Sequence, residues 1–257
     1  MTVAQAKPNP LLGPQDPLPA EVINAASDHP LLLVCEHAGK MVPNALNDLG
    51  IAQEDRDSHV FWDIGAEAVT RIMADSLGAP AILQPYSRLV IDCNRPPDAP
   101  DAMPEANHGV QVPGNRGLND AARAARIAEI FDPFQATVER HLKRQPRKIV
   151  LSIHSFTPLL TGEPRPWHVG FLFRQDVQTS EHLARFIADA QPELTIGMNQ
   201  PYQIDDASDW FVPQHGETSG LPHSLIEIRN DLIGDATGQQ AWANILTGAV
   251  NRYLKEL

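Results

Sequence analysis

Apolar residues in this chain fall into two patterns, and the first is a short continuous run. Four or five mainly apolar residues stand together between polar or turn-forming residues, as in LLLVC and IVLSI. A run of this length is typical of a strand that is covered on both faces, because both of its sides then carry apolar residues. The pattern predicts strands at residues 31–35, 80–83, 89–93, 149–153, 169–173 and 224–228.

The second pattern repeats apolar residues at helical spacing, which is typical of a helix with one buried face. It predicts helices at residues 62–77, 119–145, 180–190 and 242–254. Gly78 follows the first of these helices and is a plausible C-terminal stop. Pro133 lies inside the second, and we expect that helix to bend or break before the proline, which has no N–H to donate.

Strands and helices alternate along the chain from residue 31 onward. This order is typical of an α/β domain with a mainly parallel sheet and helices on both of its faces. We expect residues 29–257 to form one such domain. Residues 1–28 are rich in proline and lack periodicity, which predicts an extended arm. The segment HGETSGLPH, residues 215–223, is expected to be a loop, either a mobile lid or a plain surface loop.

The net charge of the chain argues against some classes of binding partner. The formal net charge is -12 over 257 residues, which argues against nucleic acid and anionic membranes, because both attract basic surfaces. A small anionic substrate is compatible with a locally positive pocket. The two cysteines lie in apolar stretches, Met1 is followed by no apolar signal segment, and no apolar run is long enough to cross a membrane. We therefore expect a cytoplasmic protein, and the sequence indicates no oligomeric state.

Polar residues stand at the ends of four predicted strands. Ligands of parallel sheets bind beyond the carboxyl ends of the strands, so these residues are expected to share one site. They are Glu36 and His37 after the first strand, Asp92, Asn94 and Arg95 at the third, His154 and Ser155 after the fourth, and Glu227 and Arg229 at the last.

Two of these residues, His37 and His154, are candidate metal ligands. Two neutral imidazoles and one carboxylate, with a fourth position open to water, form the ligand set of catalytic zinc. The carboxylate is either Glu36, which serves only if the strand has already ended, or Asp63 near the start of the next helix. The same ligand types also suit iron, cobalt, nickel or manganese.

Glu227 is the candidate proton acceptor for the attacking water. It alternates with Ile226 and Ile228 in an apolar strand, so its side chain points away from their face. A carboxylate in such a setting can act as a general base. A structural ion pair between Glu227 and Arg229 is the alternative interpretation.

Three arginines, Arg88, Arg95 and Arg229, are candidates for binding a substrate carboxylate or for stabilising an oxyanion. Ser155, which follows His154, is a further candidate for substrate binding. A nucleophilic role for this serine is disfavoured, because SIHSF lacks the Gly-x-Ser-x-Gly pattern.

Five segments of the sequence resemble, in the same order, those of the N-formylglutamate amidohydrolase family: VCEHAGKMVP, WDIGA, YSRLVIDCNRP, SIHSF and HGETSGLPHSLIEIRNDLI. The resemblance extends over most of the chain after residue 30. It implies a three-layer α/β/α fold with a mainly parallel mixed sheet, similar to that of phosphorylase/hydrolase-like proteins and zinc carboxypeptidases. It also implies hydrolysis of N-formyl-L-glutamate to formate and L-glutamate, late in histidine degradation.

The similarity to zinc carboxypeptidases implies roles for individual residues. By this resemblance, Arg88 polarises the scissile carbonyl, Asn94 and Arg95 hold the α-carboxylate of the substrate, and Glu227 is the general base. The pattern departs at one position. Carboxypeptidase-like sites have a His-x-x-Glu pair, whereas Lys40 stands three residues after the first metal histidine. The third ligand therefore comes from elsewhere, and both carboxylate candidates stay open.

We predict a zinc-dependent amidohydrolase that acts on a small anionic N-acyl amino acid, specifically N-formylglutamate. The glutamate side chain requires a second cation, for which the sequence offers Arg165, Arg174 and Arg229. Two alternatives stay open. One is hydrolysis of another N-acyl or N-carbamoyl amino acid, and the other is a non-catalytic protein that binds an acidic metabolite on the same fold.

Overall fold

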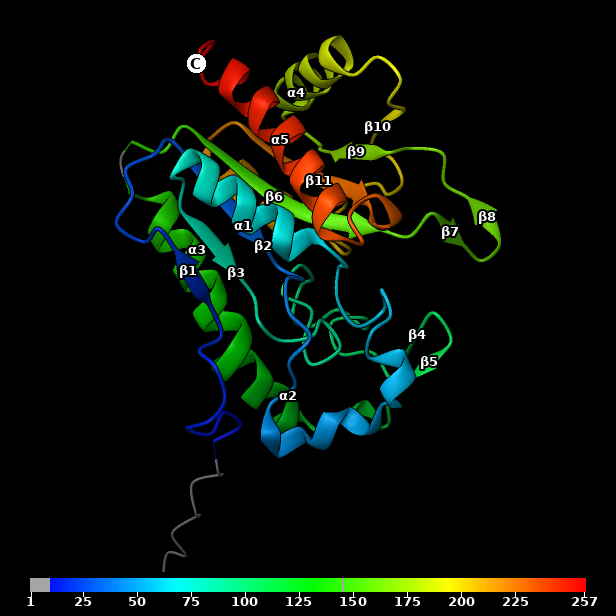
Figure 1. Cartoon of the computed structure of the whole chain (residues 1–257). Coiled ribbons are helices and arrows are strands. Elements are labelled where there is room, and N and C mark those ends of the chain that lie inside the picture. The colour runs from blue at the N-terminus through cyan, green and yellow to red at the C-terminus, as the bar shows by residue number, and fades with distance from the viewer. Residues whose placement is uncertain (1–9, 145) are drawn as a thin grey trace, which may run out of the picture.

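A seven-stranded sheet forms the centre of the molecule in the computed structural model, which describes residues 10–144 and 146–257 (Figure 1). The order of the strands across the sheet is β1-β3-β2-β6-β11-β9-β10. Their bounds are β1 (Glu21–Ile23), β2 (Leu31–Cys35), β3 (Ala81–Leu83), β6 (Ile149–Phe156), β9 (Val169–Leu172), β10 (Ile196–Met198) and β11 (His223–Arg229).

The four central strands β3, β2, β6 and β11 run parallel to one another. β1 pairs antiparallel with β3 at one edge, and β9 pairs antiparallel with β11 towards the other. β10 is parallel to β9. The sheet is therefore mixed but mainly parallel, as predicted, and the carboxyl ends of β2, β6 and β11 lie side by side.

Helices cover both faces of the sheet and give three layers. Figure 1 shows α1 (Ala66–Leu77) and α5 (Ala236–Tyr253) packed side by side on one face, where α4 (Val177–Ala190) packs against α5. α2 (Asp120–Arg126) and α3 (Asp132–Leu142) belong to the opposite face. β2 shows why the strand runs are continuous: Leu31 and Leu33 enter the core under α1, and Leu32 and Val34 enter the core under α3.

The predicted break before Pro133 is confirmed. α2 ends at Arg126, residues 127–131 form a π-helical turn, and α3 begins with Pro133 in its first turn. A proline is tolerated there because the first N–H groups of a helix have no intrahelical acceptor. The amide oxygen of Asn119 caps α2 by accepting a hydrogen bond from Ala122 N.

The prediction of a strand at residues 89–93 is wrong. Leu89–Cys93 is buried, but it forms no strand: Val90 N donates to Ser87 O in a turn, and Asp92 N donates to Ala102 O in a later loop. The apolar side chains pack in the core on the α3 side of the sheet. An apolar run of five residues reports burial, and a buried loop produces the same pattern as a strand.

The expected loop at residues 215–223 is also wrong in part. Phe211–Glu217 forms a π-helical segment, and β11 already begins at His223. His215 is buried in this segment and shares a hydrogen bond with Gln135 at 2.6 Å. The plain-loop and lid interpretations both missed this buried helical turn.

The predicted arm packs on the domain where the structure describes it. Residues 1–9 of the arm lie outside the described residues. Further along, the backbone N–H groups of Leu11 and Leu12 donate to the Glu129 carboxylate, and Tyr86 donates to Pro17 O. β1, which the sequence did not predict, adds the arm to the edge of the sheet.

Two short hairpins lie outside the central sheet. β4 (Ala106–Asn107) and β5 (Val110–Gln111) form one hairpin, and β7 (Leu159–Leu160) and β8 (Glu163–Pro164) form another, which projects from the end of β6 in Figure 1. Cys35 and Cys93 are buried free thiols. In residues 10–144 and 146–257, no helix is both long and apolar enough to cross a membrane.

Candidate active site

The predicted strand-end residues, except Arg229, meet at one edge of the sheet. His154 on β6 lies directly beside Glu227 on β11 in the register of these parallel strands. His37 follows β2, which pairs with the other side of β6. Residues that are far apart in the sequence are thus neighbours, because three parallel strands end at the same place.

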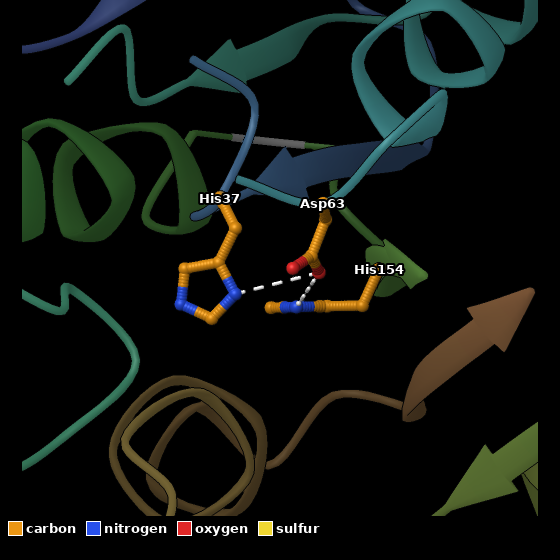
Figure 2. Close-up of side chains that lie close together, drawn as sticks. All are labelled: His37, Asp63 and His154. Carbon is orange, nitrogen blue, oxygen red and sulfur yellow. Dashed lines mark hydrogen bonds and ion pairs between the residues drawn. The ribbon is translucent and has the colours of Figure 1, made fainter. Parts of the chain in front are cut away.

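His37, Asp63 and His154 form a compact buried cluster (Figure 2). Asp63 Oδ2 lies 2.9 Å from His154 Nδ1 and 3.4 Å from His37 Nδ1. The two imidazole rings are nearly perpendicular, with centroids 4.7 Å apart. One ligand atom from each of the three residues falls within 4.8 Å of the others, so the cluster could hold a metal ion.

The turn before α1 delivers Asp63 to this cluster. Asp63 N donates to His37 O, and Ser155 N donates to Asp63 Oδ2 at 3.1 Å. The helix predicted at residues 62–77 begins only at Ala66, because Gly65 adopts a left-handed φ of 82°. The residues before it are therefore free to turn and to place the carboxylate beside both histidines.

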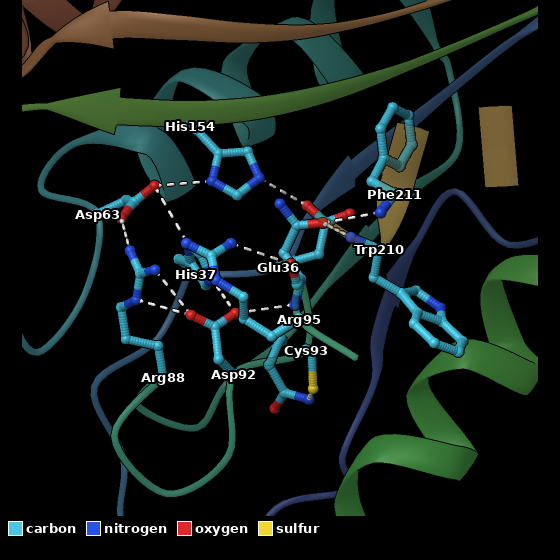
Figure 3. A network of polar contacts seen from close by, with 12 residues as sticks. Glu36, His37, Asp63, Arg88, Asp92, Cys93, Arg95, His154, Trp210 and Phe211 are labelled. Carbon is cyan, nitrogen blue, oxygen red and sulfur yellow. Dashed lines mark hydrogen bonds and ion pairs between the residues drawn. The ribbon is translucent and has the colours of Figure 1, made fainter. Parts of the chain in front are cut away.

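Each imidazole is held from behind by a second carboxylate (Figure 3). His37 Nε2 lies 2.7 Å from Asp92 Oδ1, and His154 Nε2 lies 3.0 Å from Glu36 Oε2. Ser152 Oγ donates to the same Glu36 oxygen at 2.5 Å. When Nε2 carries the proton, Nδ1 keeps its lone pair for the centre of the cluster, which is the usual orientation of metal-binding histidines.

The protonation of these groups favours a cation at the centre. Burial alone would raise the pKa of Asp63, Asp92 and Glu36, but neighbouring positive groups and hydrogen bonds hold all three pKa values below their usual range. Burial would lower the pKa of His154, and its bonds to Asp63 and Glu36 instead raise it well above the usual value. The three carboxylates are therefore ionised around a protonated His154, and a divalent metal held by this donor set would replace that proton.

Glu227 faces the same space without a hydrogen-bond partner on its Oε2 among the described residues. The side chain is buried, and burial raises its pKa to about 8, against the positive charges of His154 and Arg88. A buried carboxyl group with a raised pKa, next to a candidate metal cluster, is suited to exchange a proton with a substrate.

The cluster opens into a cavity of about 350 Å³. This volume is at the small end of the range for ligand sites and suits one small molecule. The lining includes all the groups of the cluster and several that the sequence did not single out. These additional residues are His59, His108, Thr157, Tyr202, Gln203 and Asp209.

Arg88 and Arg95 line the cavity, and both already contact carboxylates. Arg88 donates twice to Asp92 Oδ2, at 3.0 and 2.7 Å, and once to Asp63 Oδ1 at 3.4 Å. Arg95 donates through Nε to Asp101 at 2.9 Å. Asp92 thus contacts both Arg88 and His37. The spacing of Arg88 and Asp92 along the chain did not indicate this shared contact.

Asn94 makes three side-chain hydrogen bonds within the protein. Its Nδ2 donates to Asp209 Oδ2 at 2.8 Å, and its Oδ1 accepts from the N–H groups of Trp210 and Phe211. These three bonds hold the start of the π-helical segment Phe211–Glu217 against the site. Asn94 also lines the cavity, and its amide nitrogen keeps a second N–H that could donate to a substrate carboxylate.

The remaining predicted residues divide between the cavity and the surface. Ser155 lines the cavity, although its Oγ donates to Ile64 O. Arg229 does not line the cavity and instead donates to Asp231. Arg174 is likewise paired elsewhere, with Glu217 and Asp206. Side-chain direction after the end of a strand depends on the neighbouring elements, so the strand-end rule alone did not separate these residues.

Residues that the sequence missed come from segments without a strand-end signal. His59 precedes the turn of Asp63, and His108 lies at the tip of the β4–β5 hairpin. Their ring centroids are 5.9 Å apart at the cavity. Tyr202 lies in a loop after β10. Nothing in the local sequence indicates that these loops turn towards the site.

Comparisons with known proteins identify the family and the fold of this chain. The sequence matches the family model of N-formylglutamate amidohydrolase over residues 29–234. A gene product of Agrobacterium tumefaciens of known structure is 36% identical, with a TM-score of 0.90, over 96% of this chain and 98% of that chain. An N-formylglutamate amidohydrolase from Ralstonia eutropha is 21% identical, with a TM-score of 0.62, over 93% of this chain and 98% of that chain, and shares the fold. The comparison with curated proteins gives no match.

Proposed function

Because this chain belongs to the N-formylglutamate amidohydrolase family, we propose that it hydrolyses the amide bond of N-formyl-L-glutamate to formate and L-glutamate. One observation carries the proposal: the buried cluster of His37, Asp63 and His154 adjoins the buried carboxyl of Glu227 in a cavity that suits a single small molecule. A metal-ligand set beside a proton acceptor is one of the arrangements that catalyse hydrolysis of an amide.

His37, Asp63 and His154 would hold a divalent transition metal, and we propose zinc. Asp63 is the better third ligand of the two carboxylates that the sequence left open, because its Oδ2 lies between the two Nδ1 atoms. Glu36 lies behind His154 and orients that ring. When bound, the metal supplies Lewis-acid activation of a water molecule and of the scissile carbonyl.

Glu227 provides the proton transfer. As a carboxylate it accepts a proton from the attacking water, and as a carboxylic acid it returns that proton to the departing amine nitrogen. The positive charges of His154, Arg88 and Arg165 act against the burial that raises its pKa. The group can therefore exist in both forms near neutral pH, as a shuttle must.

Arg88 and Arg95 bind the polar groups of the substrate. Arg88 is fixed by Asp92 and Asp63 and lines the cavity beside the cluster, where its guanidinium can donate to the developing oxyanion. Arg95 bonds to Asp101 through Nε and lines the same cavity, which supports a role in binding the α-carboxylate. Asn94 holds the loop around Asp209 with one N–H and can donate its second N–H to that α-carboxylate.

The test combines metal content with turnover. The protein is purified without added metal or chelator, its bound metal is quantified, and glutamate release from N-formyl-L-glutamate is measured for the wild type and for His154→Ala. We expect about one zinc per chain and turnover in the wild type, and loss of both in the variant. His182→Ala, on α4 away from the cavity, is the matched control and should retain both.

Other outcomes separate the alternatives. Turnover of other N-acyl or N-carbamoyl amino acids without N-formylglutamate would discard the proposed substrate and keep the hydrolase. Binding of glutamate without turnover, unchanged by Glu227→Gln, would indicate a non-catalytic binding protein. Absence of both metal and turnover would contradict the mechanism.

A further inference from the structure

Arg165 carries a buried positive charge that no acidic group of the described residues neutralises. The residue is 8% exposed, and its guanidinium donates to Tyr202 Oη at 2.9 Å. Two other arginines of the described chain are buried, and both donate to backbone carbonyls: Arg126 to Val90 O and Gly114 O, and Arg147 to Ser27 O and His29 O. A buried guanidinium without such acceptors costs free energy unless an anion binds it.

The aromatic residues around Arg165 cover the faces of its planar guanidinium and leave the N–H groups at its edge able to bind an anion. It lies at the base of the β7–β8 hairpin, where its N–H donates to Pro158 O. The guanidinium lies 5.7 Å from the ring centroid of Phe156 and 4.8 Å from that of Tyr202. Both aromatic residues line the cavity. Aromatic rings cover the faces of the guanidinium, and its in-plane N–H groups are the ones that pair with a carboxylate.

The charge of Arg165 acts inside the cavity. It contributes to lowering the pKa of His59 and His108, for which burial is the larger cause, and it acts on the pKa of Glu227 as well. His59 Nε2 is buried and has no hydrogen-bond partner among the described residues. The phenol of Tyr202 and the imidazoles of His59 and His108 line the cavity, and the guanidinium of Arg165 donates to that phenol.

The other two arginines that the sequence offered for this purpose are occupied elsewhere. Arg174 pairs with Glu217 and Asp206, and Arg229 pairs with Asp231. Like these two, Arg165 is not itself a lining residue, but it contacts Phe156 and Tyr202, which both line the cavity. Arg88 is neutralised by Asp92 and Asp63. Of these four arginines, Arg165 is thus the one beside the cavity lining that has no acidic partner among the described residues, so an anion of the substrate can pair with it.

We propose that Arg165, framed by Phe156 and Tyr202, binds a carboxylate on the substrate side chain and restricts the enzyme to N-acyl derivatives of acidic amino acids. This inference rests on the proposed function and deepens it, because it assigns the residue that distinguishes an acidic from a neutral side chain. A site that is built to pair a charge rejects a neutral analogue, which leaves the arginine unpaired.

The experiment compares N-formyl-L-glutamate with its neutral isostere N-formyl-L-glutamine. In Arg165→Met we expect kcat/KM for the glutamate derivative to fall about 100-fold, while that for the glutamine derivative changes less than about threefold. Arg165→Lys keeps the charge without the planar fork and should recover part of the preference. Arg174→Met removes the same charge outside the cavity and should leave the ratio of the two kcat/KM values unchanged.

Equal losses for both substrates in Arg165→Met would overturn the inference, as would an unchanged preference. If the wild type hydrolyses neither compound, the proposed function fails, and calorimetry with L-glutamate and L-glutamine tests Arg165 separately. Tighter binding of L-glutamate by the wild type, lost in Arg165→Met and partly recovered in Arg165→Lys, supports the assignment. Equal binding of both amino acids by the wild type overturns it. Thermal melting confirms that each variant is folded.

Discussion

Asp63 joins both histidines of the candidate site through a single carboxylate oxygen. Its Oδ2 contacts His37 Nδ1 and His154 Nδ1 and also accepts from Ser155 N. Glu36, which the sequence offered as an equal candidate, lies on the far side of His154. The difference in position predicts a difference in function between two carboxylates of similar burial.

We therefore expect Asp63→Ala to abolish stoichiometric zinc binding and Glu36→Gln to weaken it about 10- to 100-fold, because the second residue acts only by orienting a ligand. Competition with a chelator of known affinity measures both effects. Glu67→Gln, at a partly exposed position of α1, is the control. Equal affinities of the Asp63 variant and the wild type would assign the third ligand elsewhere.

Glu227 makes the stability of the metal-free protein depend on pH. Burial raises its pKa to about 8, whereas the pKa of a glutamate in the unfolded chain is about 4.3. Between these values the folded state binds the extra proton, so the free energy of unfolding falls as pH rises towards 8 and levels off above it. Glu227→Gln removes this contribution.

We expect the melting temperature of the metal-free wild type to fall more between pH 5 and pH 8 than that of Glu227→Gln. The variant should therefore be the relatively more stable protein at pH 8. Melting curves of both proteins in the presence of a chelator provide the measurement. Parallel pH profiles would show that Glu227 titrates normally in the folded state.

At the scale of elements, Gly65 sets where α1 begins. Its φ is 82°, and a Cβ at this position would lie 2.2 Å from Ile233 O, in the segment before α5. Gly78, at the other end of α1, has a φ of 63°, and a Cβ there would meet no described atom within 4 Å. An alanine in place of Gly78 would be strained only by the left-handed backbone. An alanine in place of Gly65 would have the same strain and would also clash with Ile233 O.

We expect Gly65→Ala to destabilise the protein by about 3 kcal/mol or more and Gly78→Ala by about 1 kcal/mol. The first change should also reduce zinc affinity, since the turn that carries Asp63 must shift. Urea unfolding and a zinc titration measure the two effects. Similar costs for both alanines would mean that the contact with Ile233 relaxes easily.

Asn94 connects the loop before it to the π-helical segment Phe211–Glu217. Its side chain donates to Asp209 and accepts two backbone hydrogen bonds at the start of that segment. We expect Asn94→Ala to lower the free energy of unfolding by about 2–4 kcal/mol, because buried N–H groups lose their acceptor. Chemical denaturation measures this loss. A raised KM at unchanged stability would instead support the direct contact with substrate that the family resemblance implies.

At the scale of the whole molecule, the metal site joins two central strands, β2 and β6, and the turn before α1, so metal binding should stabilise the entire fold. Zinc at about 1,000 times its dissociation constant would add about 4 kcal/mol if it binds only the folded chain. Protons compete for His154, whose pKa is raised, despite burial, by Asp63 and Glu36. We therefore expect the zinc-dependent rise in melting temperature to be larger at pH 8 than at pH 5.5. A rise that is independent of pH would argue against histidine ligation.

The sequence by itself determined the order of the elements and the chemistry at the strand ends. Continuous apolar runs located β2, β6, β9 and β11, because a strand covered on both faces needs apolar residues on both sides. Their alternation with helices predicted the mainly parallel sheet, and that topology alone brings His37, His154 and Glu227 to one edge.

Only the tertiary structure decided which side chains face the cavity. It placed Asp63 between the histidines, Glu36 behind one of them, Asn94 in a structural network and Arg229 beside Asp231. It also showed that residues 89–93 form a buried loop. The physical reason is that a local pattern reports burial and periodicity, whereas the direction of a side chain beyond a strand end depends on contacts with segments far away in the sequence.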